Sequence, residues 1–492
     1  MARLPDTSFY EPAFMNNRPN ILLFLMDGLQ ADALEPGSAC QTPNFDRLRA
    51  QGLAFRRAYT PTPTCSPARA SLMTGLLPHN HGVLEVEHGR HADQCVLRTD
   101  KPHWAQRLRQ SDYQTAYIGK WHVERSNDLT QFGWKIDRGK AATHHKFLGQ
   151  GRDIGAELPI DPELSRYLEG PLGYNRLLHY GVTNTPPSER YPAFAVAQAI
   201  ETISQFSRDE SPWCTCVSFS EPNESLVVSR STFEKYDAKE MPLPKNLNDD
   251  LSDRPNIYQR QRLISTKVSD DEWRMARTCY HGRVTELDTE FGRLMEHLEV
   301  SGELENTIVI VTADHGRYAG AHGFDAHNFG PFEEIYRIPM IVSGPGIVAG
   351  AETSGLVGLH DLCPTILELT GNTSFDVPDS KSLVPLLRNP QAAEGAFTTA
   401  YGEYHGTRFN LAQRIIWQSD WKFVFNGFDF DELYNLKDDP HETKNLVNES
   451  EHRARVKAMM AEIWHMVRQT GDRTIEETHY YSMRIACVGP NP

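Results

Sequence analysis

Cys65 stands where a thiol can take part in chemistry. It directly precedes a Ser-Pro-Ala-Arg run within TPTCSPARASLMTGLLPHNHG, residues 62–82. Residues Thr64 to Pro67 are expected to begin a helix, with Pro67 at the first helical position. The free N–H groups of a first helical turn attract anions, and a thiol held there beside Arg69 has a lowered pKa. The pattern therefore predicts a reactive cysteine next to a binding site for a tetrahedral anion.

Two aspartates follow apolar runs of strand length. Asp27 ends NILLFLMD, and Asp314 follows NTIVIVTA. Ligands of open α/β sheets bind beyond the carboxyl ends of the strands, and two carboxylates that meet there repel each other unless a cation lies between them. Oxygen ligands favour Ca²⁺, with Mg²⁺ or Mn²⁺ as alternatives. A nitrogen from His315 would shift the preference towards a transition metal. The simpler alternative is that each aspartate caps the helix that follows it.

Four further basic residues are less specific signals. Lys120 and His122 follow the strand-like run TAYIG, and residues two apart on a strand share a face. That face could turn towards the site or towards solvent. His79 and His81 come near the end of the expected helix, where a histidine more often caps carbonyls or packs than touches a substrate.

The apolar pattern predicts the framework that positions these residues. Strand and helix signals alternate along most of the chain, which favours a large mixed, mostly parallel sheet flanked by helices. One helix is expected over residues 43–52. A longer one is expected over residues 272–300, where apolar residues recur every three or four positions. PWCTCVSFS and IPMIVSGPG are further strand candidates. The fold class expected from this alternation is α/β.

The pattern changes near residue 390. The runs AFTTAYGEY, RIIWQSD and WKFVFNG resemble meandering strands, and Ala454 to Thr470 resembles a closing helix. We expect one domain over residues 1–390 and a smaller antiparallel C-terminal domain over residues 391–492. The stretches 125–190 and 222–265 are expected to be loops that shape a pocket. Side chains of the first stretch that could line that pocket are His144, His145 and Arg152.

Composition and charge exclude several classes of protein. The net charge of −15, without a Lys/Arg-rich run, argues against nucleic acid as a partner. The run Ile21 to Met26 is too short to cross a bilayer, and the first residues lack the apolar segment of a secretory signal. We therefore expect a cytoplasmic protein without a membrane partner. The eight cysteines are too scattered for a disulfide framework. Cys214 and Cys216 alternate along an expected strand and are interpreted as buried hydrophobes rather than zinc ligands.

The series of motifs resembles the type I sulfatases of the alkaline phosphatase superfamily. Their signature is Cys-x-Pro-x-Arg, followed here by ASLMTGLLPHNHG, and its cysteine is converted to Cα-formylglycine. Other blocks match in the same order, namely NILLFLMDG, TPNFDRL, YIGKWH, RVTELDTEFGRL with NTIVIVTADHG, EEIYRIPMIVSGPG, DLCPTILELTG and ELYNLKDDPHETKNL. Cys-x-Pro-x-Arg alone is a weak signal, but this series is specific and covers most of the chain. The resemblance implies a sulfatase-like fold and hydrolysis of a sulfate monoester to an alcohol and inorganic sulfate.

The resemblance also implies a cofactor and a maturation partner. A formylglycine-generating enzyme would convert residue 65, whose hydrated aldehyde would bind a divalent metal, Ca²⁺ by expectation, and attack sulfur. This route avoids a second S–O hydrolysis, because the sulfated hydrate can eliminate sulfate by C–O cleavage. The implied metal ligands are Asp27, Cys65, Asp314 and His315.

Other residues receive catalytic roles from the same resemblance. Arg69 and Lys120 would neutralise oxygens of the aldehyde hydrate and the sulfate. Asp314 would help to take the proton of the attacking hydroxyl. His122 would remove the remaining hydroxyl proton, so that sulfate leaves and the aldehyde is regenerated.

The chain departs from the family's pattern at the first metal-binding strand. Many members have a second acidic or amide ligand directly after the aspartate, where this chain has Gly28. Either the metal has fewer protein ligands, or water fills the gap, or a nearby group such as Gln30 or Asp32 takes the place of the missing side chain.

The residues expected near the leaving group also depart from the family's pattern. Asn223 replaces a histidine that helps to protonate the leaving oxygen, and an amide cannot act as an acid. The lysine usual after the Asp-His-Gly strand is missing, and HGFDAHNFGPFEE offers His322 and His327 instead. We expect His327 to be an anion contact or the general acid, and Asn223 and His322 to contact the substrate.

Four functions are compatible with these residues. Sulfate monoester hydrolysis is the leading one, and hydrolysis of a phosphodiester or phosphonate monoester by the same machinery is the second. A binding protein with a degraded site and a redox role for Cys65 as a plain thiol are the others. The organic part of the substrate could be a sugar, an aryl group or a small alkyl group.

Overall fold

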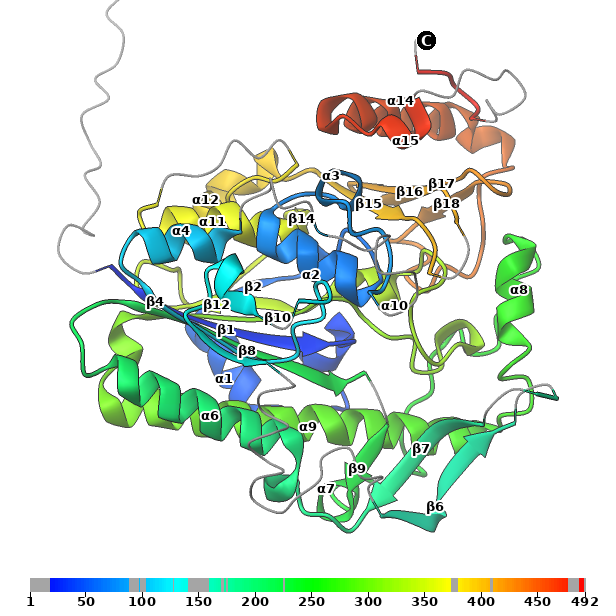
Figure 1. The fold of residues 1–492 in the computed structure, drawn as a ribbon. Coiled ribbons are helices and arrows are strands. Elements are labelled where there is room, and N and C mark those ends of the chain that lie inside the picture. Colours follow the sequence, from blue (N-terminus) through cyan, green and yellow to red (C-terminus); the bar gives the residue numbers. More distant parts are fainter. Residues whose placement is uncertain are drawn as a thin grey trace, which may run out of the picture.

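The centre of the fold is an eight-stranded sheet (Figure 1). The computed structural model describes residues 18–87, 97, 103–126, 128–139, 159–169, 172–173, 176–223, 226–372, 379–407, 410–476 and 486–490. In spatial order the strands are β13 (Ala351–Thr353), β2 (Leu53–Phe55), β12 (Met340–Ser343), β10 (Thr307–Ala313), β1 (Asn20–Asp27), β8 (Trp213–Pro222), β4 (Gln114–Gly119) and β5 (Ile136–Gly139).

Most neighbouring strands of this sheet are parallel. The five strands from β10 to β5 run parallel to one another, whereas β12 lies antiparallel to both β10 and β2. The predicted α/β class with a mixed, mostly parallel sheet is confirmed. The strand expected in IPMIVSGPG is β12, the antiparallel member.

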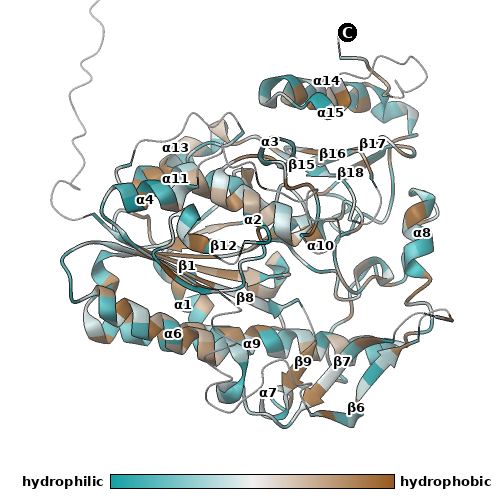
Figure 2. Ribbon diagram, viewed as in Figure 1, coloured by the Kyte–Doolittle hydropathy of each residue, from teal (hydrophilic) through white to brown (hydrophobic). Residues whose placement is uncertain are grey.

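Helices cover both faces of the sheet, and this explains its continuous apolar strands. All eight residues of β1 are buried, and Figure 2 shows the central strands as the most apolar part of the ribbon. In Figure 1, one face carries α2 (Cys65–Thr74), α4 (Trp104–Gln110), α11 (Leu362–Leu369) and α12 (Val384–Arg388). The other face carries α1 (Pro43–Gln51), α6 (Tyr191–Phe206) and α9 (Asp270–Ser301).

The long helix α9 is the longest element and begins and ends with strong signals. Ser269 and Glu272 form a capping box, in which the Ser269 side chain accepts from the Glu272 N–H and Glu272 reaches back to the Ser269 N–H. Gly302 ends the helix with φ 77°, a conformation that favours glycine. Within the described residues, none of the helices combines the length and the apolar character that a bilayer span requires.

The stretches expected to be loops contain regular structure. β6 (Ile160–Leu168), β7 (Leu177–Thr183) and β9 (Val227–Ser229) form a small sheet against α9, and α7 (Arg230–Phe233) and α8 (Asn256–Arg262) follow. The expectation was wrong because β6 is polar and half exposed, so it lacks the apolar pattern of a buried strand. His144, His145 and Arg152 lie outside the described residues.

The C-terminal region is an antiparallel meander. β15 (Thr399–Tyr404), β16 (Gln413–Gln418), β17 (Trp421–Asn426) and β18 (Glu432–Asn435) pair in chain order, and α14 (Arg453–Thr470) packs on them. Tyr336 and Trp417 pack together across the expected domain boundary, with ring centroids 5.5 Å apart. The boundary at residue 390 stays a prediction. The remaining strands and α-helices of the described residues are β3 (Ala58–Tyr59), β11 (Arg337–Ile338), β14 (Val357–Gly358), α3 (Pro78–His81), α10 (Glu333–Tyr336), α13 (Pro390–Ala393) and α15 (Arg473–Glu476).

Candidate active site

The first part of the site is a pair of aspartates at the ends of two neighbouring strands. β1 and β10 run parallel and in register, so Asp27 and Asp314 reach the same edge of the sheet. Both side chains are fully buried. Asp314 Oδ1 accepts hydrogen bonds from the backbone N–H groups of His315 at 2.9 Å and of Gly28 at 3.3 Å. The two strands thus bring the carboxylates together as the sequence predicts.

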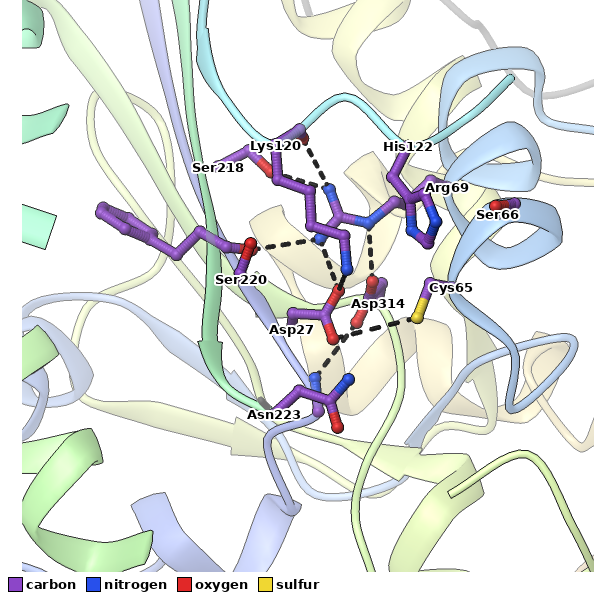
Figure 3. A network of polar contacts seen from close by, with 12 residues as sticks. Asp27, Cys65, Ser66, Arg69, Lys120, His122, Ser218, Ser220, Asn223 and Asp314 are labelled. Atoms are coloured by element: carbon purple, nitrogen blue, oxygen red, sulfur yellow. Dashed lines mark hydrogen bonds and ion pairs between the residues drawn. The ribbon is translucent and has the colours of Figure 1, made fainter. Parts of the chain in front are cut away.

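Cys65 is the first residue of α2, and its thiol faces these aspartates (Figure 3). Its Sγ lies 3.9 Å from Asp27 Oδ1 and 3.1 Å from His315 Nε2, and the residue is buried. The helix begins two residues before its predicted start at Pro67. The prediction was wrong because a proline fits anywhere in a first turn, where the N–H groups have no partner within the helix.

Arg69, one turn further along α2, ties the two aspartates together. Its Nε donates to Asp314 Oδ2 at 2.7 Å and its Nη2 to Asp27 Oδ2 at 3.0 Å. The other N–H groups donate to the Ser218 hydroxyl and to the carbonyl oxygens of Lys120 and residue 219. All five guanidinium donors therefore have protein partners. The expected role of Arg69, neutralising oxygens of the aldehyde hydrate and the sulfate, stays a prediction, and in this structure its charge acts on the two aspartates.

Lys120 and His122 lie just beyond β4 rather than on it. β4 ends at Gly119, whose φ is +101° and whose Cα faces the Ser218 carbonyl, at 1.9 Å from where a Cβ would lie. The chain turns there, and Lys120 Nζ donates to Asp27 Oδ2 at 2.5 Å. His122 lies beside Cys65 (Figure 3). The two side chains converge on the site through this turn, not through a shared strand face.

The two aspartates ionise unequally. Burial acts to raise the pKa of Asp27, but Lys120, His315 and Arg69 outweigh it and hold that pKa well below its usual range. Burial, followed by the charge of Asp27, raises the pKa of Asp314. Two carboxylates at one point thus share the available positive charge, and a further cation would let both ionise.

The surroundings of Cys65 lower the pKa of its thiol. Burial and Asp27 act to raise the pKa of Cys65, yet Lys120, His315 and His327 outweigh them and place it well below its usual range. Burial acts to lower the pKa of His315, but nearby acidic groups raise it to about 10. The position of His315 therefore favours a positive charge.

His315 and His327 direct their Nε2 atoms at the site. Their rings stack with centroids 3.8 Å apart. His315 Nδ1 lies 2.8 Å from the Gly316 carbonyl oxygen and His327 Nδ1 lies 3.0 Å from that of Pro63. Since a carbonyl accepts only from a protonated nitrogen, both Nε2 atoms carry a lone pair in the neutral ring. His327 Nε2 is 4.0 Å from Cys65 Sγ.

A chain of polar contacts fixes the orientation of Asn223. Arg317 donates to Asn223 Oδ1 at 3.0 Å and to Asp325 Oδ1 at 3.0 Å. Because Arg317 requires the oxygen on its own side, the Nδ2 of Asn223 faces His327 Nε2, at 3.1 Å. Asn223 also occupies the space beside Gly28, where an added Cβ would lie 2.8 Å from the Asn223 Cβ.

Neither of the groups expected to compensate for Gly28 does so. Gln30 Nε2 donates to the Tyr318 carbonyl at 3.0 Å. Asp32 pairs with Arg337 and has a side chain that is 68 % exposed. Both residues point away from the aspartates, and the space beside Gly28 belongs to another side chain.

His322 lies apart from this cluster. It is fully buried and stacks on Phe332 with centroids 3.8 Å apart, and its nitrogens contact Asn246 at 2.9 Å and Asp249 at 2.8 Å. The structure therefore does not bring it to the expected substrate position, because its loop turns inward towards the C-terminal region.

His79 and His81 also have structural partners. His81 contacts Ser71 Oγ at 3.0 Å, and His79 pairs with Glu403 of β15. This agrees with the expectation that histidines near a helix end pack or cap rather than touch a substrate.

Sequence reasoning missed three residues that shape the site. Ser218 supports Arg69, and Arg317 with Asp325 orients Asn223. Ser218 is a polar residue in the otherwise apolar run CVSF, which was an available signal. The pairing of Arg317 with Asp325 depends on a turn of the chain, and spacing alone does not show it.

A parallel sheet with two strand-end aspartates, facing a nucleophile at a helix start, defines the alkaline phosphatase superfamily. A family model described as Sulfatase matches residues 19–372, and one described as N-sulphoglucosamine sulphohydrolase, C-terminal, matches residues 320–469. The chain belongs to the sulfatase family, and it is an enzyme of that class.

Individual relatives agree with this assignment. The chain is 27 % identical over 456 residues to a choline-sulfatase of Rhizobium meliloti (strain 1021), covering 87 % of this chain and 82 % of that one. A protein solved in complex with its substrate D-glucosamine-2-N,6-O-disulfate superposes with a TM-score of 0.73 at 21 % identity, over 94 % of this chain and all of the other. A phosphonate monoester hydrolase of Agrobacterium radiobacter gives 0.77 at 21 % identity, over 92 % and 96 % of the two chains. The two solved structures confirm the fold.

Proposed function

We propose that this enzyme hydrolyses a sulfate monoester to an alcohol and inorganic sulfate, with Cα-formylglycine made from Cys65 as nucleophile. The observation that carries the proposal is the position of residue 65. It lies at the start of a helix, 3.9 Å from Asp27 and 3.1 Å from His315, and is buried between them. A formylglycine-generating enzyme is the maturation partner that this proposal requires.

The residues present fit a divalent cation. One ligand atom each from Asp27, Cys65, Asp314 and His315 lies within 4.8 Å of the others. With an oxygen at residue 65 the set becomes three oxygens and one imidazole nitrogen, which suits Mn²⁺ better than the expected Ca²⁺. When bound, such an ion supplies positive charge opposite the reacting oxygens. These four residues would hold it.

The surrounding side chains have distinct tasks. Arg69 keeps the Oδ2 atoms of both aspartates turned away from residue 65, so that their Oδ1 atoms face it. Lys120 Nζ, 2.5 Å from Asp27, adds positive charge beside the position of the sulfate. His122 lies beside residue 65 and can take its hydroxyl proton (Figure 3).

His327 is the best candidate for the general acid. Its Nε2 lies 4.0 Å from Cys65 Sγ and 3.1 Å from Asn223 Nδ2, so the ring, once protonated at Nε2 and no longer accepting from Asn223, reaches the region where the alcohol leaves. In His327→Ala, hydrolysis of esters with poor leaving groups should fall far more than hydrolysis of nitrophenyl sulfate. Equal losses on both substrates would reject this role.

The charge balance favours substrates with a single negative charge. Arg69 is fully used inside the protein and Lys120 already pairs with Asp27, so little positive charge remains for a dianion. This disfavours phosphate monoesters. Phosphodiesters and phosphonate monoesters carry one charge, like sulfate monoesters, and they form the second candidate class. Sulfate and phosphate release from matched nitrophenyl esters, measured side by side, decides between the two classes.

The organic part of the substrate is a small molecule or a saccharide unit. A choline-sulfatase is among the relatives, and the C-terminal match is to the family model of N-sulphoglucosamine sulphohydrolase. A library of sulfated oligosaccharides and small sulfate esters, screened for sulfate release, would identify it.

The main experiment joins the modification to the activity. Protein from a host with the converting enzyme is digested, and the peptide containing residue 65 is weighed by mass spectrometry. We expect the aldehyde mass, sulfate release that chelation abolishes and Mn²⁺ restores, and no sulfate release by Cys65→Ala. An intact thiol in fully active protein would overturn the proposal.

A further inference from the structure

The thiol of Cys65 gives the site a second donor set, different from the one used in catalysis. Sγ of Cys65 lies 3.1 Å from His315 Nε2 and 3.9 Å from Asp27 Oδ1. His315 Nε2 lies 3.7 Å from Asp27 Oδ1 and 3.5 Å from Asp314 Oδ1. One sulfur, one nitrogen and two oxygens, one atom from each residue, thus lie within 4.8 Å of one another.

These separations match those of a tetrahedral zinc site. Zn–S bonds of about 2.3 Å and Zn–N and Zn–O bonds of about 2.0–2.1 Å place neighbouring ligand atoms about 3.3–3.6 Å apart. The four measured separations, from 3.1 to 3.9 Å, bracket this range. Shifts of a few tenths of an ångström would complete the geometry.

The orientation of the donors is already set. The Nδ1 of His315 donates to the Gly316 carbonyl at 2.8 Å, which directs Nε2 at the sulfur, so that Nε2 becomes a metal ligand once it releases its proton. A backbone carbonyl in this role is the usual outer support of a metal-binding histidine. Arg69 binds only the Oδ2 atoms of Asp27 and Asp314, so their Oδ1 atoms remain on the side of the thiol.

His327 is not a fifth ligand. Its ring stacks on that of His315 with an interplanar angle of 19°. An imidazole binds a metal in the plane of its ring, and two nearly parallel rings cannot both direct their lone pairs at one ion. His327 instead covers His315 from the substrate side.

The other clusters of metal-binding residue types in the described part of the chain are weaker candidates. The group of His79, Glu403 and Asp472 contains Arg414, and the group around Glu442 contains Lys422. Neither group contains a thiol, the donor that distinguishes the site of Cys65.

We propose that the unconverted protein, with its thiol at residue 65, binds Zn²⁺ through Asp27, Cys65, Asp314 and His315. A thiolate with an imidazole selects zinc over Ca²⁺, Mg²⁺ or Mn²⁺. Conversion of the thiol to an aldehyde removes the soft ligand and turns the preference towards the harder catalytic ion. Only this last step rests on the proposed function. The number of zinc ions per chain in a preparation would then equal the fraction of its molecules that are unconverted.

The test uses protein from a host without the converting enzyme, with the thiol verified by mass spectrometry. The metal-free protein is titrated with Co²⁺, a spectroscopic substitute for Zn²⁺. We expect one Co²⁺ per chain and a near-ultraviolet thiolate-to-cobalt charge-transfer band. Zn²⁺ at equal concentration should remove the band, and excess Mn²⁺ should not.

Variants identify the ligand. Cys65→Ala should lack the band and bind Zn²⁺ about 100-fold more weakly or worse. Cys363→Ala, which alters a buried thiol of α11 outside the site, should keep both. Asp27→Asn, which retains the thiol, should also weaken zinc binding. This variant provides the test if Cys65→Ala folds poorly.

Two results would overturn the proposal. One is the absence of the band in folded protein with the intact thiol, and the other is its persistence in Cys65→Ala. Sulfate release is not measured in this titration, so a negative result leaves the proposed hydrolysis untouched. Conversely, converted protein without sulfatase activity would leave the zinc result standing.

Discussion

Two of the buried clusters in the described part of the chain combine an arginine with two carboxylates and can be compared directly. The catalytic cluster consists of Asp27, Asp314 and Arg69, and the C-terminal cluster of Glu403, Asp472 and Arg414. In the C-terminal cluster every carboxylate oxygen has a partner. Asp472 accepts from Arg414 Nε at 2.8 Å and from the N–H of residue 474 at 2.9 Å. The two oxygens of Glu403 contact His79 and His405.

The catalytic cluster has similar charges but a different arrangement of them. Arg69 contacts one oxygen of each aspartate and leaves the other oxygens on a common side, facing Cys65 and His315 (Figure 3). A buried ionic cluster therefore becomes a site when its cations occupy one face of the carboxylates and leave the other face to a ligand. The amount of charge does not make this difference.

The largest effect is expected when a carboxylate of the catalytic cluster loses its charge. Asp314→Asn should lower kcat/KM by about 10³-fold or more, because it removes both metal affinity and charge stabilisation. The matched change in the other cluster, Asp472→Asn, should leave kcat/KM within about threefold below its unfolding temperature. Steady-state assays of the two purified variants check this. A comparable loss of activity in both would erase the distinction between the clusters.

Removing the arginine of the C-terminal cluster should act on stability. Arg414→Met leaves buried carboxylates without their cation, which costs about 3–5 kcal/mol of the free energy of unfolding. Arg274→Ala removes an exposed pair with Asp271 and should change it by less than about 1 kcal/mol. Urea denaturation measures both variants. An equal effect of the two substitutions would show that burial does not set how much each ion pair contributes to the free energy of unfolding.

On the leaving-group side, the orientation of Asn223 should matter less than the aspartates. Arg317→Met lets its amide turn away from His327, and we expect kcat to fall about 10–100-fold. Asn223→Ala should have a similar effect, and the double variant should be no worse than either alone because both act through one contact. Additive losses in this double-mutant cycle would contradict the shared contact.

The smallest effect is a pH dependence of stability from the C-terminal cluster. Burial acts to lower the pKa of His79, but Glu403 raises it to about 9 from its ordinary value of 6.5. A raised pKa in the folded state stabilises the protein below pH 6.5, and this contribution is lost as the pH rises through about 9. The unfolding temperature of wild type should therefore fall over this range more than that of His79→Asn. Parallel curves would show that His79 is not protonated in the folded protein.

The central strands of the sheet could be predicted because they are buried on both faces. β1, β8 and β10 appear as short apolar runs, and the ends of two of them locate Asp27 and Asp314 correctly. The antiparallel meander and its closing helix were equally visible, with α14 beginning one residue before its predicted start at Ala454. The pattern of apolar residues was sufficient to predict an element wherever that element is buried.

Other features depend on contacts that spacing does not encode. The small sheet of β6 has a half-exposed polar strand, so its sequence looks like a loop. Lys120 reaches Asp27 through a turn at Gly119, not through strand alternation. His322 resembles His327 in sequence but lies on Phe332, because the chain between them reverses direction. Only the fold separates two histidines five positions apart.

The chain that leaves the helix of Cys65 reaches the C-terminal cluster within a few residues. α2 ends at Thr74, and α3 begins four residues later and carries His79 to Glu403. A random mutant library of this enzyme should accordingly contain two kinds of defective clone. Those altered at the aspartates will be inactive at any growth temperature. Those altered around Glu403 will be temperature-sensitive alleles, restored by cultivation in the cold, although the substituted residue lies outside the active site.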